Sequence, residues 1–199
     1  MAFNKGADWL QTDRAVANPY YGSKMFSCGS VTKELPPSLK RTGKEERQPP
    51  DAGGREGMGA LFANYFDLQT ALAADQATQS LQAFQALQVA ARSVGTGQSD
   101  KAKAAIEALR KTLVGPAPSD IAGQRARFET ISNAMLSLQA VAGHPGDAPI
   151  YRIHCPMAFD NKGADWIQLD KTVANPYFGS RMLRCGSVKA ELKAEGEQR

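Results

Sequence analysis

The feature that most constrains this chain is a segment that occurs twice. Residues 1–31 align with residues 157–188, with one gap opposite Asp160, and 23 of the 31 aligned pairs are identical. Identity at that level is far above chance and indicates an internal repeat. Near its end, each copy carries a cysteine followed by glycine, at Cys28 and at Cys185. The chain therefore contains one motif twice, near its two ends, and other segments lie between the copies.

The two copies differ in what precedes them. Residues 150–156 (Ile-Tyr-Arg-Ile-His-Cys-Pro) precede the second copy, whereas the first begins at Met1, inside the motif. We therefore expect a truncated N-terminus, with no signal peptide in the chain as given. The odd number of cysteines, three, agrees with this. Cys155 and Cys185 make a complete pair, and the partner of Cys28 would lie before the first residue.

Composition divides the chain into five segments. Residues 32–57 are charged, rich in proline and glycine and nearly free of large apolar side chains, which is typical of a disordered linker. The C-terminal tail is charged and is expected to fray. The predicted order is an orphaned partial repeat, a linker, a helical bundle, a Cys/Met motif region and a tail, at residues 1–31, 32–57, 58–143, 144–188 and 189–199. The third and fourth segments are expected to pack as one domain, residues 58–188.

Apolar residues recur with a helical period in four stretches between Met58 and Gly143. The first stripe contains Leu61, Tyr65, Leu68 and Leu72. Asp75 is placed to cap the second helix, and pairs of glycine and proline separate the later stretches. The predicted fold class is mainly α: a four-helix up-down bundle, followed by a small region with a strand and a short helix.

After the bundle the period changes to two. Ile150 to Cys155 alternates as a strand does, with Tyr151, Ile153 and Cys155 on one face and Arg152 and His154 on the other. The stretch from Ala164 to Ile167 is expected to pair with it. Asn175 is expected to cap a short helix that starts at Pro176 and runs to Arg184. Asp165 has no partnered base in the sequence, so no catalytic pair is expected.

Four sulfur-containing side chains lie on these two pieces: Cys155, Met157, Met182 and Cys185. If the strand and the helix pack together, the four can meet. Thiolates and thioethers favour Cu(I) over hard cations, and Zn²⁺ is less favoured because thioethers suit it poorly. His154 is a further candidate ligand, although strand alternation directs it away from Cys155. The alternative is a structural disulfide between the cysteines, with both methionines as core residues.

The sequence from about Leu61 to Val188 resembles an uncharacterised domain family of bacterial cell-envelope proteins. Two sets of residues carry the resemblance: Tyr65–Leu72 with Asp75, Gln124, Arg125, Phe128, Ser132 and Met135; and His154–Ala158, Gly163–Trp166, Asn175–Gly179 and Met182–Gly186. That family occurs alone or fused to the C-terminus of periplasmic adaptor subunits of copper/silver efflux systems. The resemblance implies a periplasmic role in heavy-metal handling. The segment also resembles the Cys-Pro-Met motif of metal-binding modules on copper-transporting ATPases, except that Ala158 stands where those modules have histidine.

The expected function is therefore a periplasmic module that binds or relays heavy metal, preferably Cu(I). The expected partners are an efflux adaptor or a metallochaperone. The alternative is an interaction domain that docks on such an adaptor and is braced by a disulfide between Cys155 and Cys185. No catalytic triad, phosphate loop or zinc-protease motif is recognisable, so the chain is not expected to be an enzyme. A net charge of +4 without a basic stripe argues against nucleic-acid binding, and no apolar run approaches the length of a membrane span.

Overall fold

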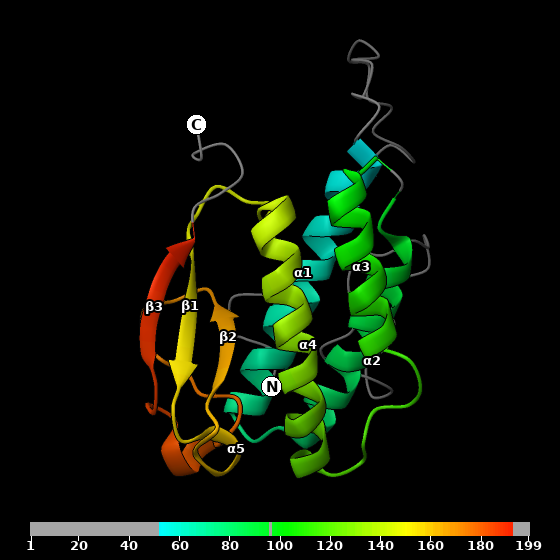
Figure 1. Ribbon diagram of the computed structural model, residues 1–199. Coiled ribbons are helices and arrows are strands. Elements are labelled where there is room, and N and C mark those ends of the chain that lie inside the picture. Colours follow the sequence, from blue (N-terminus) through cyan, green and yellow to red (C-terminus); the bar gives the residue numbers. More distant parts are fainter. Residues whose placement is uncertain (1–51, 96, 193–199) are drawn as a thin grey trace, which may run out of the picture. The chain divides into compact units, whose positions relative to one another are not determined.

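The computed structural model describes residues 52–95 and 97–192 (Figure 1). The predictions for residues 1–31, for most of the linker and for the end of the tail lie outside this range. Within it, the chain is mainly helical and ends in a small antiparallel sheet. The mainly α class is confirmed. None of the helices in this range is both long and apolar enough to cross a membrane.

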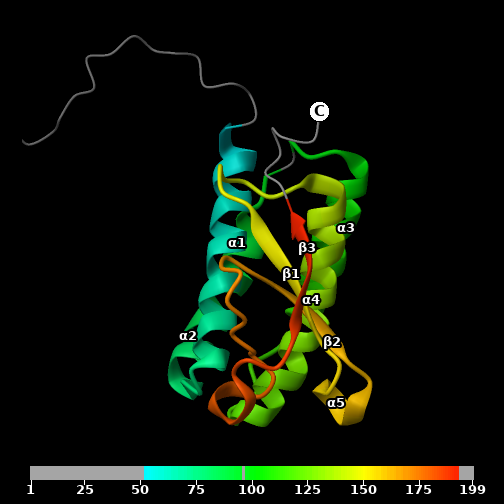
Figure 2. The ribbon, with the colours of Figure 1, turned by 90° about the vertical axis from the view of Figure 1, so that its left-hand side faces the viewer.

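Four long helices come first: α1 (Ala52–Ala73), α2 (Ala77–Ser93), α3 (Asp100–Thr112) and α4 (Ile121–Ala142). The closest pairings are α1 with α2 and α3 with α4, and both α1 and α4 also contact the sheet (Figures 1 and 2). The up-down arrangement of a four-helix bundle stays a prediction. The stripes predicted from the sequence face inward, with the exception of Val141 at the end of the α4 stripe, which exposes 44% of its surface. Among the fully buried side chains are Leu61, Leu68, Leu72, Leu87, Leu109, Phe128, Ile131, Met135 and Leu138.

Helix α1 begins at Ala52, so residues 52–57 of the predicted linker are helical. That part of the linker prediction is wrong. The reason is visible at Gly57, which lies against the end of α2. A Cβ atom at this position would stand 3.0 Å from the Cα atom of Val94 and 3.1 Å from the carbonyl oxygen of Ser93. Glycine here permits a close approach between two helices, although in the sequence it looked like part of a flexible segment.

The junction between α1 and α2 also differs from the prediction. Asp75 has a φ of 60° and ends α1 in the left-handed conformation, where aspartate is tolerated better than most residues. The amide of Gln76 donates to the carbonyl of Ala71 at 2.9 Å, as in a Schellman-type helix end. Gln76, not Asp75, occupies the position before α2. The carboxylate of Asp75 is thus free to bind elsewhere.

The sheet has three antiparallel strands in the order β2-β1-β3. They are β1 (Ile150–Cys155), β2 (Ala164–Gln168) and β3 (Ser187–Leu192), and a short turn of helix, α5 (Ala158–Asn161), lies between the first two. The prediction that residues 164–167 pair with the strand at 150–155 is confirmed, with Cys155 opposite Ala164. The alternation is confirmed as well, because Tyr151, Ile153 and Cys155 are all buried.

Two predictions for the C-terminal part are corrected. The expected helix from Pro176 to Arg184 is only a 3-10 turn, η2 (Gly179–Met182), because Gly179 takes a left-handed φ of 60°. The tail does not fray from Lys189, since β3 continues to Leu192 against β1. Backbone pairing and an ion pair of 3.0 Å between Lys171 and Glu191 hold this charged strand in place.

Candidate functional site

The centre of the candidate site is a pair of thiols. Cys155 ends β1 and is fully buried, whereas Cys185 lies in the turn before β3 and is half-buried. Their Sγ atoms are 3.1 Å apart, and both cysteines are free. We call Cys155 and Cys185 the thiol pair. Of the four sulfur-containing side chains that were expected to meet, the structure brings the two cysteines into contact, although 30 residues separate them.

The turn carrying Cys185 can reach β1 because a glycine follows it. Gly186 has a φ of 135°, a conformation that residues with a side chain rarely adopt. A Cβ atom there would lie 3.1 Å from the carbonyl oxygen of His154 and 3.1 Å from the ring of Trp166. The backbone therefore passes directly over the buried face of the sheet, which brings the side chain of the preceding cysteine against Cys155.

Asn175 holds the same turn from the other side. It is fully buried, and its Nδ2 group donates to the carbonyl of Cys185 at 2.7 Å. Its Oδ1 atom accepts from the amides of Tyr177 at 2.8 Å and Phe178 at 3.2 Å. Its own amide donates to the carbonyl of Leu183 at 2.8 Å. The predicted capping role of Asn175 is corrected, because η2 begins at Gly179 after Phe178 and the helix expected from Pro176 is absent. Its side chain instead closes the turn that precedes η2 and fixes the position of a thiol.

Cys185 is protonated at neutral pH. The contact with the Cys155 thiol, followed by partial burial, raises the pKa of Cys185 to about 11. A thiolate next to a second sulfur in a partly buried site is unfavourable. A metal ion that binds here must therefore displace protons, and an uncomplexed Cys185 is a poor nucleophile at pH 7.

The other predicted sulfur ligands, Met157 and Met182, are close to the thiol pair along the chain. Met157 is at the start of the β1–β2 connection and exposes 47% of its surface. Met182 is half-buried at the end of η2, and its carbonyl accepts from the amide of Cys185 at 2.9 Å. Within residues 52–95 and 97–192, no three His, Cys, Asp or Glu side chains are grouped as a metal site. Any metal here would therefore depend on the thiol pair and on thioethers.

His154 faces away from the thiol pair, as strand alternation predicts. Its Nδ1 atom lies 3.1 Å from Oδ1 of Asp165, directly opposite on β2. The other carboxylate oxygen accepts from Arg152 at 3.0 Å. The expectation that Asp165 lacks a basic partner was wrong. The signal was the register of the hairpin. With β1 aligned on β2, Asp165 lies on the same face of the sheet as Arg152 and His154.

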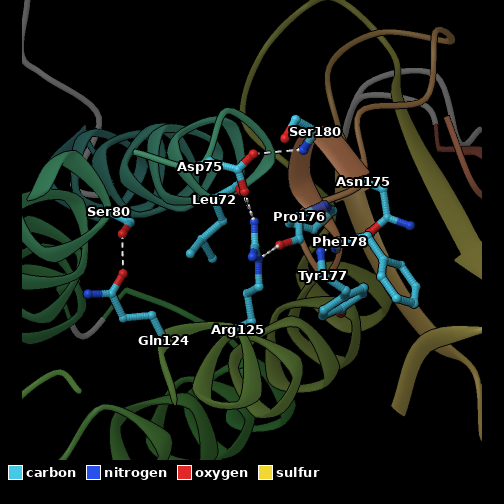
Figure 3. A network of polar contacts seen from close by, with 10 residues as sticks. All are labelled: Leu72, Asp75, Ser80, Gln124, Arg125, Asn175, Pro176, Tyr177, Phe178 and Ser180. Atoms are coloured by element: carbon cyan, nitrogen blue, oxygen red, sulfur yellow. Dashed lines mark hydrogen bonds and ion pairs between the residues drawn. The ribbon is translucent and has the colours of Figure 1, made fainter. Parts of the chain in front are cut away.

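A second polar cluster holds the loop between β2 and β3 on the helices (Figure 3). Arg125 of α4 is buried, and its Nη2 atom lies 2.5 Å from Oδ1 of Asp75. Its Nε group donates to the carbonyl of Pro176 at 2.9 Å, and Nη2 also donates to the carbonyl of Leu72. Asp75 accepts from the amide of Ser180 at 2.8 Å. We call Asp75 and Arg125 the anchor pair, because they bind the loop that carries η2.

The pKa of Asp75 lies well below its usual range. The hydrogen bond from Ser180 contributes most, followed by the guanidinium of Arg125. Gly179 lies flush against the anchor pair, since a Cβ atom there would overlap both Asp75 and Arg125. This contact explains why a glycine stands next to Ser180. Gln69 extends the attachment by donating to the carbonyl of Ala174 at 2.7 Å.

Aromatic side chains fill the space between helices and sheet. Tyr65 of α1 contacts Ser132 Oγ at 2.8 Å, and its hydroxyl accepts from the amide of Ile167 at 3.2 Å. Tyr177 packs edge-on against Trp166 and close to Phe128, and it donates to the carbonyl of Asp165 at 2.6 Å. Burial raises the pKa of both tyrosines above the usual value. Side chains of the helices thus hold β2 and the loop through hydrogen bonds to their backbone atoms, in addition to apolar contacts.

Sequence reasoning missed the anchor pair as an interaction. Asp75 and Arg125 are 50 residues apart. Asp75 was expected to cap a helix, and Arg125 was noted only as a feature of a resemblance. The available signal was an arginine on the inward side of α4, one turn before the buried Phe128. A charged residue in an apolar stripe requires a partner, but the sequence does not say which one.

Comparison with known proteins gives one match. Residues 61–145 match the model of a family described as a protein of unknown function, DUF3347. The match runs from α1 to just beyond α4 and ends before β1, so it includes the anchor pair and excludes both members of the thiol pair. It supports an uncharacterised domain family for the helical region. No curated protein and no solved structure matched the chain.

Proposed function

We propose that residues 58–188 form a module that binds or relays heavy-metal ions, with Cu(I) as the preferred ion. The observation that supports this proposal is the contact of 3.1 Å between Cys155 Sγ and Cys185 Sγ. Two adjacent thiols on a fixed strand and a fixed turn supply soft ligands, and soft ligands favour Cu(I). One thiol is buried and the other half-buried, so an ion can arrive from the side of Cys185.

The methionines are assigned supporting roles. Met157 follows Cys155 by two residues and is exposed, so we propose that its thioether receives an ion before the thiols do. Met182 lies one turn before Cys185 and can approach the same ion. We further propose a periplasmic location and an efflux adaptor or metallochaperone as the exchange partner, on the basis of the resemblance described above. We propose no catalytic activity.

A Cu(I) titration of reduced protein tests the proposal. Cys28→Ser removes the third thiol, so the two remaining thiols can be counted. Under anaerobic conditions, in competition with a chromophoric Cu(I) chelator, this protein should bind one equivalent. A further Cys155→Ser or Cys185→Ser exchange should abolish most of the binding, and Met157→Leu or Met182→Leu should weaken it less. The control is Ser137→Ala, which alters an exposed side chain on α4 that is bonded only within its own helix and should have no effect.

The pH dependence provides an independent check. Cu(I) must replace the proton of Cys185, whose pKa is about 11, so affinity should rise with pH throughout the neutral range. The expected slope is about tenfold per pH unit for each proton released. Thioethers do not titrate, so Met157→Leu should leave this slope unchanged. If the reduced protein takes up no Cu(I), or if the double cysteine variant binds as well, the proposal is wrong.

The same sulfur contact also supports the alternative, an interaction domain braced by a disulfide. Cys155 and Cys185 are close and held by separate backbone anchors, so oxidation would join strand and turn covalently. The mass of protein isolated from its native compartment without reductant distinguishes the two. A loss of two hydrogens, together with failure to bind Cu(I) after reduction, would establish the alternative.

A further inference from the structure

The separation of the thiols indicates which kind of ion they suit without rearrangement. For a sulfur–metal distance of about 2.3 Å, two sulfurs stand about 4.6 Å apart across a linear centre, about 3.8 Å apart at a tetrahedral angle and about 3.3 Å apart at a right angle. The observed distance of 3.1 Å is closest to the right-angled case. A linear Cu(I) complex would require the sulfurs to move apart by more than an ångström.

We infer that the thiol pair is a binding site for trivalent arsenic, which takes two thiols at nearly right angles because a lone pair occupies part of its coordination sphere. The inference deepens the proposed function and rests on it, since it uses the same reduced, reachable sulfurs. It adds a ligand class whose bond angle suits the observed geometry. The two thiols supply both sulfur bonds, and the third position on arsenic stays with its own substituent.

The chemistry is a condensation and involves no change of oxidation state. An organic arsenoxide, R–As=O, reacts with the two thiols to form two S–As bonds, and its oxygen leaves as water with both thiol protons. With arsenous acid, two As–OH groups leave as two waters and one As–OH remains. The reactants are neutral thiols and a neutral arsenic compound, so no net proton is released. The site requires neither an oxidant nor a base.

The different burial of the two thiols sets the order of this reaction. Cys185 is half-buried and can react first. Cys155 is fully buried and within contact distance, so it closes the ring. Burial of one sulfur then limits the access of water that would reverse the reaction.

The test uses phenylarsine oxide on the full chain carrying Cys28→Ser, after reduction and removal of reductant. Intact mass spectrometry should show one phenylarsenic unit bound and two hydrogens lost. The adduct should survive excess glutathione, a monothiol, and be removed by dithiothreitol, a dithiol. In Cys155→Ser or Cys185→Ser protein, resistance to glutathione should fall at least about tenfold. Met157→Leu and Met182→Leu should bind phenylarsine oxide as well as the parent.

Parallel Cu(I) titrations separate this inference from the proposed function. Between pH 6 and 8, phenylarsine oxide affinity should stay level while Cu(I) affinity rises. Cu(I) binding without a glutathione-resistant adduct would overturn the arsenic inference and leave the proposed function standing. A glutathione-resistant adduct without Cu(I) uptake would support the arsenic inference and overturn the proposed Cu(I) function. If single-cysteine variants keep a resistant adduct, arsenic is not held by the pair and the inference is wrong.

Discussion

The helical region and the sheet region differ in the kind of contact that their polar and reactive side chains make. In the helices, apolar side chains interlock, and the buried polar side chains of Arg125, Tyr65 and Gln69 reach out to the second region. What they bind there is mostly backbone, such as the carbonyl of Pro176 and the amide of Ile167. In the sheet region, by contrast, the reactive side chains are the thiols, which contact each other.

This difference shows how position and chemistry are separated. Contacts to backbone atoms fix where the loop runs while leaving most of its side chains free to vary. The match to an uncharacterised family ends before β1 and so covers the part that supplies position. Gly179 is an exception on the loop, because only a residue without Cβ fits against the anchor pair. The comparison predicts that damage to the anchor pair will loosen the thiol pair at a distance.

The largest effect is expected for Arg125→Ala. The change removes the hydrogen bonds to Pro176 and Leu72 and leaves Asp75 without its cation. Breaking a buried ion pair typically costs about 3–5 kcal/mol of unfolding free energy. Because Asp75 is partly exposed, we expect about 3 kcal/mol here. Urea unfolding measures it. Cys185 should also react faster with a thiol reagent in the native state.

The control for that experiment is Lys103→Ala. Lys103 forms an exposed pair of 3.2 Å with Asp100 on α3, and such pairs contribute about 0–1 kcal/mol. Its removal should change neither stability nor Cys185 reactivity appreciably. If Arg125→Ala lowers stability but leaves the reactivity of Cys185 unchanged in folded protein, the helices do not control the thiol turn, and the comparison fails at its central point.

Gly179→Ala should rank second. The new methyl group would need a left-handed backbone at a φ of 60° and would overlap the carboxylate of Asp75. Backbone strain of about 1 kcal/mol and overpacking of about 1–2 kcal/mol against the ends of two side chains together give an expected loss of about 2–3 kcal/mol. Gly115→Ala is the matched control, because its φ is 85° and a Cβ atom there meets nothing within 4 Å.

The difference between the two glycine variants isolates the contact from the backbone strain. Gly115→Ala should cost only about 1 kcal/mol. Equal losses in thermal or urea unfolding would mean that the close approach at Gly179 contributes nothing, and that the loop is held by its hydrogen bonds alone.

Local patterns were sufficient to predict part of this structure. The alternation from Ile150 to Cys155 identified β1 and its buried face, because a strand buried on one side leaves that trace in its own residues. Pairing with residues 164–167 followed from a short connection. These predictions concern neighbours along the chain, where turn length and period suffice.

What sequence could not provide were the contacts between distant segments. The anchor pair joins Asp75 to Arg125 through the junction of two helices and the loop, and no local pattern relates them. Strand β3 was missed because Lys189 and Glu191 resemble a solvated tail until a partner strand supplies backbone hydrogen bonds. The thiol contact was predictable in part. Two cysteines in one motif indicate that they lie close together, but the sequence does not set the distance between their sulfur atoms.

Tyr65→Phe tests the attachment of β2 to α1 and should have a smaller effect. The hydroxyl contacts Ser132 and accepts from the amide of Ile167 in a fully buried site. Leaving that amide without its acceptor should cost about 1–2 kcal/mol. Tyr151→Phe is the control, because among the described residues its hydroxyl has no hydrogen bond. Slower amide exchange at Ile167 in the variant than in the parent would contradict the assignment.

The smallest effect concerns the charge of Asp75, and it is present at neutral pH and disappears in acid. Its pKa is lowered in the folded state, mainly by the amide of Ser180 and then by Arg125. A depressed pKa means that the carboxylate stabilises the fold above its unfolded pKa of about 4, and that this contribution disappears as pH falls toward the folded value. Asp75→Asn keeps an oxygen acceptor and tolerates the left-handed backbone, so it removes mainly the charge.

At pH 7, Asp75→Asn should therefore be less stable than the parent by up to about 1 kcal/mol, a modest value because the side chain is about a third exposed. Urea unfolding at pH 7, 5 and 3 should show the two proteins converging only below pH 4, since the unfolded parent then takes up a proton that the folded parent does not. Lys103→Ala should show no such convergence. A gap that stays constant down to pH 3 would assign the role of Asp75 to hydrogen-bond geometry alone, and the anchor pair would then hold the loop by shape and not by charge.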